Sequence, residues 1–348
     1  MSTASGAPGS GSAPDPYVLD LHTHGPGFVP PPFRTVWRGL TRRAPAEAGF
    51  EALRTAGVDA VVAAAVGDPV VTRCYIGRRP WQAVEEQLAR VERQARDAGA
   101  TVARSVADLG RAREAHRPAV VLGVEGADAL GRDVDAVDAW QGRGVRVVGL
   151  VHLQDDTLGT TCLPWQRYAG PLPVRRRSAR GLTRFGAQVV TRMNRLGVVV
   201  DVAHCDRETV LDVVDVATAP VIASHSGAHA LQDFARYLTD DELAGIAATG
   251  GLVGLWPYRS THAGVRDVPA LLEHARHIAD LVGPEHLAVG TDSNGVPGVM
   301  AGYRGLTDLP TLRDGLLGAG FDGPEVQGIL GANALRVLRD VEEAAQRS

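Results

Sequence analysis

The sequence predicts a single (β/α)₈ barrel of the α/β class, and three observations support this fold. From Tyr17 onward, short Val-rich runs alternate with longer segments of helical periodicity, which is the pattern of parallel strands joined by crossover helices. Eight such runs can be counted, and eight strands close a barrel. No G-x-G-x-x-G turn follows the first run, so an open dinucleotide-binding sheet is disfavoured.

The eight predicted strands have similar lengths and are separated by turn-rich segments. In chain order they are YVLDLH (17–22), DAVVAAAV (59–66), AVVLGVE (119–125), VRVVGLVH (145–152), VVVDVAH (198–204), PVIASH (220–225), GLVGLW (251–256) and HLAVGTD (286–292). The clearest helical patterns between them cover 81–99, 182–197 and 268–283. The segment 324–346 is predicted to be a closing helix with a charged end.

Composition excludes several classes of partner and of chemistry. The chain has 348 residues, 45% of them hydrophobic, which is ample for a packed core. The formal net charge of -4 gives no general attraction to nucleic acid or to an anionic membrane. All 36 basic residues are Arg because the sequence contains no Lys, which excludes a Schiff-base lysine, a P-loop lysine and a carboxylated-lysine metal bridge.

The first residues and the cysteines indicate location. Residues 1–16 (MSTASGAPGSGSAPDP) predict a disordered leader, and residues 17–348 predict one domain. The leader has neither a basic start nor a long apolar stretch, and no later segment reaches the ~18 apolar residues of a membrane span. Cys74, Cys162 and Cys205 are odd in number and show no C-x-x-C spacing. We therefore expect free thiols and a cytoplasmic protein.

Side chains that can bind metal stand at the ends of six predicted strands. In VLDLHTHG, His22 and His24 lie two residues apart, so both project from the same face of a strand. The carboxyl ends of barrel strands converge on one face, so residues distant in sequence should meet there. The complete set is His22, His24, Glu125, His152, His204, His225 and Asp292.

This set suits two divalent ions better than one. Neutral imidazoles and carboxylates bind zinc and related ions. Four histidines and a glutamate are too many for one catalytic centre, but they fit two ions that share a bridging carboxylate and a hydroxide. Without lysine, Glu125 is the predicted bridge. For a residue taken alone, the alternative is structural: a histidine hydrogen-bonded at a strand end, or Asp292 as the cap of the next turn.

The other histidines are not assigned to the metal site. His229 follows His225 by four residues, but it is not predicted to be a ligand. The rest lie in predicted helices or loops and are expected at the surface: His116, His262, His274, His277 and His286.

Five segments of the chain form a recognisable set: GVEGAD, GVRVVGLVH, GLTRFGAQVVTRMNRLGVVVDVAH, APVIASHSGAHAL and LAVGTD. Together they resemble the renal (membrane) dipeptidase family, which is peptidase family M19 of the amidohydrolase superfamily. The resemblance extends from Leu19 to about Arg339. It implies a (β/α)₈ barrel, two zinc ions and hydrolysis of dipeptides, with some members also opening β-lactams. A homodimer is a further expectation from the resemblance.

The resemblance implies a metal-binding role for five residues. His22 and His24 would hold the first ion, Glu125 would bridge, and His204 and His225 would hold the second.

It also implies how substrate is bound and cleaved. His152 resembles the histidine that polarises the scissile carbonyl, and Asp292 resembles the strand-eight acid that shuttles a proton. Arg236 resembles the arginine that grips the substrate carboxylate, and Tyr258 is expected to reach the pocket. The alternative for Arg236 is a surface ion pair with a nearby aspartate, Asp240 or Asp241.

Two segments depart from the family pattern. The family usually has His-x-Asp in the first motif, whereas this chain has His22 and His24, so one negative charge is lost at the first metal. The bound water should then be more acidic, and the preferred metal can change. The strand-seven segment GLVGLWPYRS also differs from the usual Asn-Phe-Tyr motif of the family, so the substrate specificity can differ as well.

The expected function is that of a zinc-dependent hydrolase that cleaves the amide bond of dipeptides, or of dipeptide-like small molecules with a free carboxylate. The nucleophile would be a hydroxide that bridges the metals. One alternative is an amidohydrolase of the same fold that acts on a lactam or on another biosynthetic amide intermediate. A less favoured alternative is a metal-binding barrel without turnover.

Overall fold

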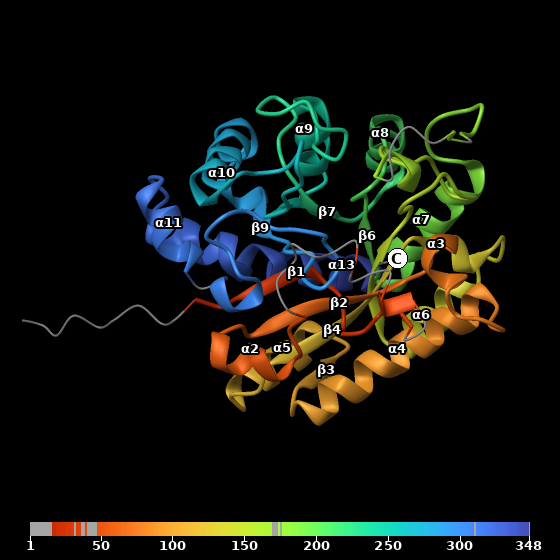
Figure 1. The fold of residues 1–348 in the computed structure, drawn as a ribbon, viewed down its shortest axis with the longest axis horizontal. Coiled ribbons are helices and arrows are strands. Elements are labelled where there is room, and N and C mark those ends of the chain that lie inside the picture. The colour runs from red at the N-terminus through yellow and green to blue at the C-terminus, as the bar shows by residue number, and fades with distance from the viewer. Residues whose placement is uncertain are drawn as a thin grey trace, which may run out of the picture.

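The computed structural model is a parallel β-barrel surrounded by helices (Figure 1). It describes residues 16–30, 33–35, 39, 47–168, 173–174, 176–309 and 311–347. The predicted disordered leader, residues 1–16, lies outside the described residues except for Pro16.

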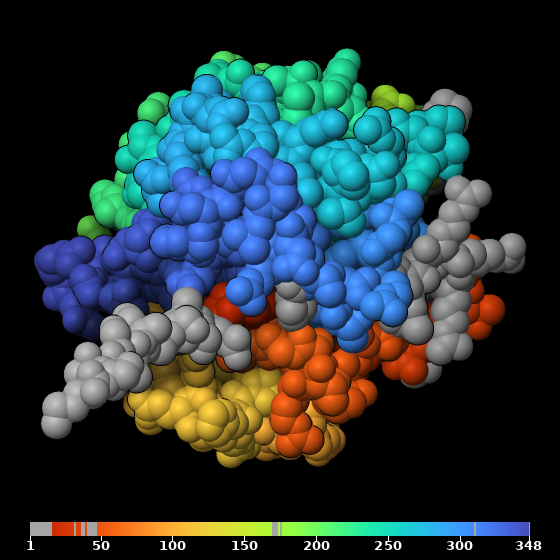
Figure 2. All heavy atoms as spheres, turned by 90° about the vertical axis from the view of Figure 1, so that its left-hand side faces the viewer, coloured from red at the N-terminus to blue at the C-terminus, as the bar shows by residue number. Residues whose placement is uncertain are grey.

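Eight strands form the barrel, and all of their pairings are parallel. They are β1 (Leu19–Thr23), β2 (Ala60–Val66), β4 (Ala119–Glu125), β5 (Val145–Gly149), β6 (Val199–Asp201), β7 (Val221–Ser226), β8 (Leu252–Leu255) and β9 (Leu287–Val289). Each pairs with the next in this order, and β9 pairs with β1, which closes the barrel. Figure 2 shows C-terminal segments in blue lying against N-terminal segments in red and orange. The predicted fold class is confirmed.

A ninth strand, β3 (Thr101–Ala103), was not predicted from the sequence. It pairs with Ala119 to Val121, the first residues of β4, whereas β5 pairs with β4 from Leu122 onward. The strand therefore covers the part of the β4 edge that β5 leaves open. Its three residues, two of them only partly buried, are too few to give a recognisable pattern.

Helices follow most of the strands. The α-helices are α2 (Glu51–Ala56), α3 (Pro69–Thr72), α4 (Pro80–Asp97), α5 (Val106–Glu114), α6 (Ala136–Arg143), α7 (Arg184–Leu196), α8 (Arg207–Val216), α9 (Asp240–Ala248), α10 (Val268–Val282), α11 (Leu312–Gly318), α12 (Gly323–Gln327) and α13 (Asn333–Gln346). Short 3₁₀ segments are η2 (Ala127–Leu130), η3 (Trp165–Arg167), η4 (Pro284–His286) and η5 (Leu306–Asp308), and η6 (Gly328–Ala332) is a π-helical turn.

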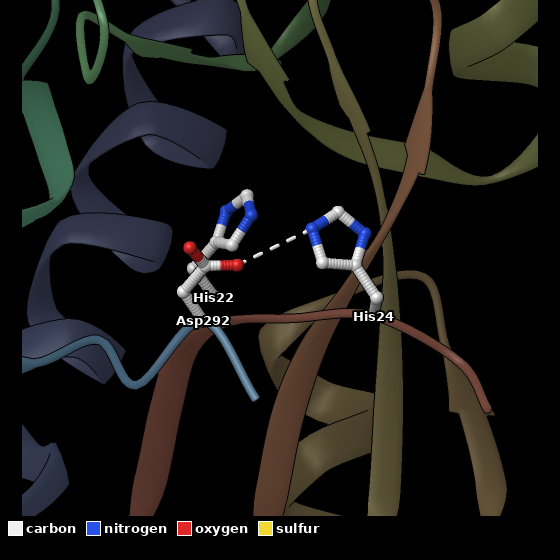
Figure 3. Close-up of side chains that lie close together, drawn as sticks. All are labelled: His22, His24 and Asp292. Carbon is white, nitrogen blue, oxygen red and sulfur yellow. Dashed lines mark ion pairs between the residues drawn. The ribbon is translucent and has the colours of Figure 1, made fainter. Parts of the chain in front are cut away.

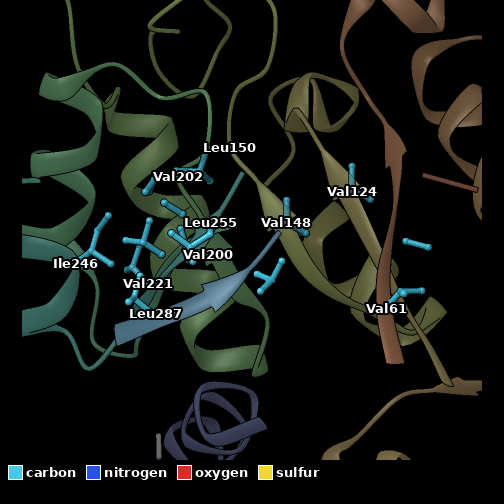
Figure 4. Close-up of a cluster of buried hydrophobic side chains, with 14 of the residues drawn as sticks. Val61, Val124, Val148, Leu150, Val200, Val202, Val221, Ile246, Leu255 and Leu287 are labelled. Atoms are coloured by element: carbon cyan, nitrogen blue, oxygen red, sulfur yellow. The ribbon is translucent and has the colours of Figure 1, made fainter. Parts of the chain in front are cut away.

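The barrel strands are buried on both faces, which explains their almost continuous apolar sequences. Neighbouring residues of one strand belong to two different clusters. Val61 of β2 packs in the larger cluster with residues of the surrounding helices, whereas Val62 packs in a second cluster with residues of α13. Figure 4 shows side chains of the larger cluster along several strands. The strands thus form a rigid frame whose carboxyl ends hold the polar residues.

Among the described residues, no helix is both long and apolar enough to cross a bilayer.

The expectation that His274 lies at the surface is wrong, because this residue is 5% exposed. It follows Leu271 by three residues and precedes Ile278 by four, so it shares the buried face of α10.

Candidate metal centre

The carboxylate of Glu125, at the end of β4, lies among five imidazole rings. Each of these histidines points its Nε2 atom at the carboxylate. The distances to Oε1 are 3.5 Å for His22, 3.2 Å for His204 and 3.7 Å for His225, and those to Oε2 are 3.4 Å for His24 and 3.5 Å for His152. The sequence-predicted metal residues therefore converge on both oxygens of one buried carboxylate.

His22 of β1 and His24, the residue directly after β1, meet the acid that follows β9. The rings of His22 and His24 are edge to face, with centroids 5.1 Å apart, and Asp292 Oδ1 lies 3.4 Å from His24 Nε2. Figure 3 shows these three side chains turned toward one another from β1 and from the connection after β9. Nitrogen or oxygen atoms of the three lie within 4.8 Å of each other, so the group could hold an ion.

Unusual backbone conformations place two of these residues beyond the strand ends. His204 and Asp292 have φ angles of 69° and 52°, values that non-glycine residues rarely adopt. Both follow strands that end earlier than the sequence predicts, at Asp201 and Val289. Backbone hydrogen bonds fix the second turn, since Asp292 donates to the His22 carbonyl at 2.8 Å. Such strain persists where the surrounding structure imposes it, typically at functional sites.

Hydrogen bonds on the outer ring nitrogens orient the imidazoles. His24 donates from Nδ1 to the backbone carbonyl of Ala64 at 3.0 Å. The Ser224 hydroxyl donates to Asp201 at 2.6 Å and therefore accepts from His225 Nδ1 at 2.9 Å. In both rings Nδ1 carries a proton, so Nε2 is the ring nitrogen that faces the centre, as in metal-binding histidines generally.

Burial and neighbouring charges set the protonation of the centre. Burial lowers the pKa of His22, and it lowers those of His204 and His225 well below their usual range. Burial alone would raise the pKa of Glu125, but the surrounding histidines lower it well below its usual value. These four residues thus form a carboxylate anion beside three neutral imidazoles.

His24 differs from these three rings. Burial alone would lower its pKa, but hydrogen bonds and charges of Asp292 and Glu125 raise it to about 10. This ring lies between two carboxylates, which favour a positive charge at this position.

The donor set fits divalent metal ions. His22 Nε2 is buried without a hydrogen-bond partner, and the Nε2 atoms of His204 and His225 lie 3.1 Å apart. A cation beside two ring nitrogens this close together can bind to both of them. Within the described part of the chain, three groups have ligand atoms within 4.8 Å of one another: His22, His24 and Asp292; His22, Glu125 and His225; and Glu125, His152 and His204. Histidine and carboxylate ligands of this kind suit zinc and its neighbours.

His152 lies three residues beyond β5, and its Nε2 is as close to Glu125 as those of the other histidines. Its ring meets the His204 ring edge to face, with centroids 4.4 Å apart. Burial alone would lower the pKa of His152, but Glu125 and Asp68 raise it. This histidine therefore faces the metal centre from the β5 side.

The alternative interpretation of Arg236 as a surface ion-pair residue is wrong. Arg236 is 3% exposed, and its Nε and Nη2 atoms have no hydrogen-bond partner. The two aspartates suggested for it pair elsewhere, Asp241 with Arg207 and Asp240 with His277. A buried guanidinium with unused donors is suited to an anionic ligand.

The surroundings of Arg236 include aromatic rings and a cavity. Its guanidinium lies over the Trp256 ring at 4.8 Å, and Trp256 stacks on Tyr258 at 4.3 Å. Arg236 and His204 also line a cavity of about 180 Å³ that extends toward Glu242. Tyr258 is 3% exposed and stacks on Trp256, and the expectation that it reaches the substrate pocket stays a prediction.

Three polar residues that support the histidine rings of the centre were not predicted from the sequence. Asp201 and Ser224 support His225, and Asp68 contacts His152 Nδ1. A signal was available for each, because all three are polar residues within or just after apolar strand runs. Their partners could not be read from the chain, since the contacts join separate strands.

Comparison with known proteins identifies the family to which the chain is related. The family model described as membrane dipeptidase (peptidase family M19) matches residues 18–348. Dipeptidase tcpJ of Claviceps purpurea is 29% identical over 247 residues, which are 68% of this chain and 54% of that protein. Dipeptidase 3 of Mus musculus is 32% identical over 238 residues, 66% of this chain and 46% of that protein. The chain thus spans about half the length of the curated relatives it matches.

Solved structures share the fold. The probable dipeptidase PvdM of Pseudomonas aeruginosa superimposes with a TM-score of 0.80 at 19% identity, covering 95% of this chain and 96% of that one. A metallo peptidase of Rhodobacter sphaeroides, liganded with a phosphinate mimic of L-Ala-D-Ala, gives 0.76 at 23% identity, covering 94% and 100%. With the family match over nearly the whole chain, the protein belongs to the membrane dipeptidase family, peptidase family M19.

Proposed function

We propose that the protein is a metal-dependent hydrolase that cleaves the amide bond of dipeptides, or of dipeptide-like small molecules with a free carboxylate. The main support is the carboxylate of Glu125 with five Nε2 atoms 3.2 to 3.7 Å from its two oxygens. Membership of a dipeptidase family supports the same reaction class. The fold alone would not, since this barrel serves many chemistries.

The proposed cofactor is a pair of divalent ions, with zinc as the expected metal. His22 and His24 would hold one ion, His204 and His225 the other, and Glu125 would contact both. When bound, such a pair supplies a water nucleophile at neutral pH and polarises the substrate carbonyl.

Residues around the centre would perform the remaining steps. Arg236 would bind the substrate carboxylate through its unused Nε and Nη2 donors, and this contact fixes the position of the amide. His152 would face the carbonyl oxygen and stabilise the charge that develops on it. Asp292, beside the β1 histidines, would accept a proton from water and pass it to the leaving amine.

A substrate panel tests this proposal. L-Ala-D-Ala is a suitable first substrate, because its phosphinate mimic binds the Rhodobacter relative. The zinc-loaded protein should hydrolyse free dipeptides, and capping the C-terminus as an amide should lower kcat/KM by at least roughly tenfold, the value of one charge-assisted contact. Hydrolysis of a β-lactam alone would favour the lactam alternative. Turnover of no amide in the panel would refute the proposal.

A further inference from the structure

His152 has a carboxylate partner that the sequence analysis did not assign. Its Nδ1 atom contacts Oδ2 of Asp68, a residue 84 positions earlier in the chain. The Asp68 side chain is fully buried, and that of His152 is 12% exposed. The two residues follow β2 and β5, the strands on either side of β4, so they flank the strand that carries Glu125.

Asp68 is held in place by a helix. Its Oδ1 atom accepts hydrogen bonds from the backbone N–H groups of Val70 at 2.6 Å and Val71 at 3.2 Å, which makes it the N-cap of α3. The other oxygen, Oδ2, faces His152. One carboxylate therefore joins the start of a helix to a ring in the metal centre.

Gly126 makes room for this contact directly after Glu125. Its φ angle is 78°, a region that favours glycine. A Cβ atom at this position would lie 3.0 Å from Cβ of His152 and 3.5 Å from Cβ of Asp68. The chain turns away from Glu125 at a residue without a side chain, so the segments after β2 and β5 can meet there.

The chemistry of the contact fixes the imidazole. A carboxylate can only accept a hydrogen bond, so His152 carries a proton on Nδ1 and points Nε2 at the centre, 3.5 Å from Glu125 Oε2. When Nε2 also carries a proton, it can donate to a carbonyl oxygen there. The Ala64 carbonyl and the Ser224 hydroxyl likewise accept from Nδ1 of His24 and His225. Those partners are neutral, whereas the partner of His152 is an anion that holds the ring more firmly.

We propose that Asp68 is a positioning residue for the reaction, which acts by holding the His152 ring with Nδ1–H toward itself, so that Nε2–H donates to the oxygen of the scissile carbonyl. The proposal rests on the proposed function, because that function assigns His152 to the carbonyl. Without Asp68 the ring can rotate and change tautomer. Loss of Asp68 should therefore lower kcat by roughly 10- to 100-fold, the usual range for residues that hydrogen-bond to a reactive imidazole and orient it. KM should change little.

Asp68→Asn is the informative substitution. The helix N–H groups require an acceptor, so the asparagine oxygen must take the place of Oδ1, and its NH₂ group then faces His152 Nδ1. An amide NH₂ only donates, so it cannot accept the Nδ1 proton. The matched control is Asp322→Asn, which makes the same change at the exposed N-cap of α12, where Asp322 accepts from Glu325 N–H at 2.8 Å.

The first measurement is a double-mutant cycle on the zinc-loaded enzyme. Asp68→Asn should lower kcat in the wild-type background and have less than about a twofold effect in the His152→Ala background, because its action passes through the ring. Metal content should stay at the wild-type value, and Asp322→Asn should keep full kcat. Equal losses in both backgrounds, or an unchanged kcat, would overturn the proposal.

The second measurement does not depend on turnover. Long-range ¹H–¹⁵N NMR of the zinc-loaded protein should show a protonated Nδ1 on His152, assigned with His152→Ala, and this signature should disappear in Asp68→Asn. A protonated Nδ1 that persists in the variant would contradict the pairing. If wild-type protein cleaves no dipeptide, the proposed function fails, whereas the NMR result still decides whether Asp68 sets the tautomer.

Discussion

Glu125 is the residue on which the metal centre depends most, since both of its oxygens face imidazole nitrogens. Glu125→Gln keeps the shape but removes the charge that two cations would share. We predict that this variant loses metal and activity together, with at least about a 10³-fold loss of kcat/KM, the scale seen when a major electrostatic group is removed from an active site. Metal analysis by mass spectrometry and a dipeptide assay check this.

The control for Glu125→Gln is Glu342→Gln. It makes the same chemical change at a residue that accepts a hydrogen bond from the Val106 backbone N–H and does not belong to the metal centre. This control should retain metal and rate. Normal rates with two ions held by Glu125→Gln would show that Glu125 does not bridge.

His24 is the position at which the chain departs from the usual family motif. His24→Asp should keep the metal, because a carboxylate also binds zinc, at about 2.0 to 2.2 Å. Its added charge should raise the pKa of bound water and move the acid limb of the pH–rate profile upward. His24→Ala should instead lower the metal content from two ions toward one. Two tightly held ions in His24→Ala would show that His24 only lies beside the site.

At the scale of elements, the connections after the strands place the reactive groups. Gly126 connects β4 to η2 with φ at 78° and ψ at 107°. Gly126→Ala should cost about 1 to 3 kcal/mol of unfolding free energy from backbone strain and should also push His152 and Asp68 apart. We therefore predict a loss of kcat as well as of stability, measured by denaturant titration and by the dipeptide assay.

Gly99→Ala is the control that separates backbone strain from displacement of neighbouring side chains. Gly99 also has a positive φ, 71°, but a Cβ atom at this position would have no neighbour within 4 Å. This control should lose about 1 kcal/mol and keep its rate. If Gly126→Ala keeps wild-type kcat, the packing around Gly126 does not position His152.

Helix α10 is tied to the loop after β7 by a buried histidine. His274 Nδ1 accepts from the backbone N–H of Ala228 at 2.9 Å, and burial, with the charge of His277, lowers the pKa of His274 to about 4. The unfolded chain therefore binds a proton between pH 6.5 and 4 that the folded one excludes. Stability should be fully present above about pH 6.5 and fall by about 3 kcal/mol as the pH drops to 4.

Unfolding free energies of wild type and His274→Gln between pH 4 and 7 test this expectation. In His274→Gln, the difference in unfolding free energy between pH 7 and pH 4 should largely disappear. His277→Gln, which changes a half-buried residue of the same helix, should retain this difference. Identical pH slopes in wild type and His274→Gln would contradict a buried neutral histidine.

At the scale of the whole molecule, barrel closure could be predicted because every barrel strand is buried on both faces. Such strands have nearly continuous Val and Ala sequences, as in β2 and β4. The meeting of the candidate metal-binding residues could also be predicted, because the ends of the strands of a closed parallel barrel share one face. The three-residue β3 lacked a pattern, and His274 was missed although its spacing from Leu271 and Ile278 was readable.

The partners behind the centre could not be predicted. Asp68 precedes Pro69 after an apolar run, and from sequence such a residue is simply a helix cap. Its contact with His152 depends on the positions of β2 and β5 on either side of β4. It also depends on the absence of a side chain at Gly126. These are properties of the assembled barrel, and no local pattern encodes them.

The most direct test of the account is a titration of zinc into metal-free protein while the hydrolysis of L-Ala-D-Ala is followed. Circular dichroism should first show that the metal-free protein keeps its fold, because the apolar core of the barrel lies apart from the ligands. We predict no turnover without metal, and a rate that rises with added zinc and levels off at two ions per chain. Full activity without metal, or a plateau at one ion, would contradict the account of a two-metal hydrolase built around Glu125.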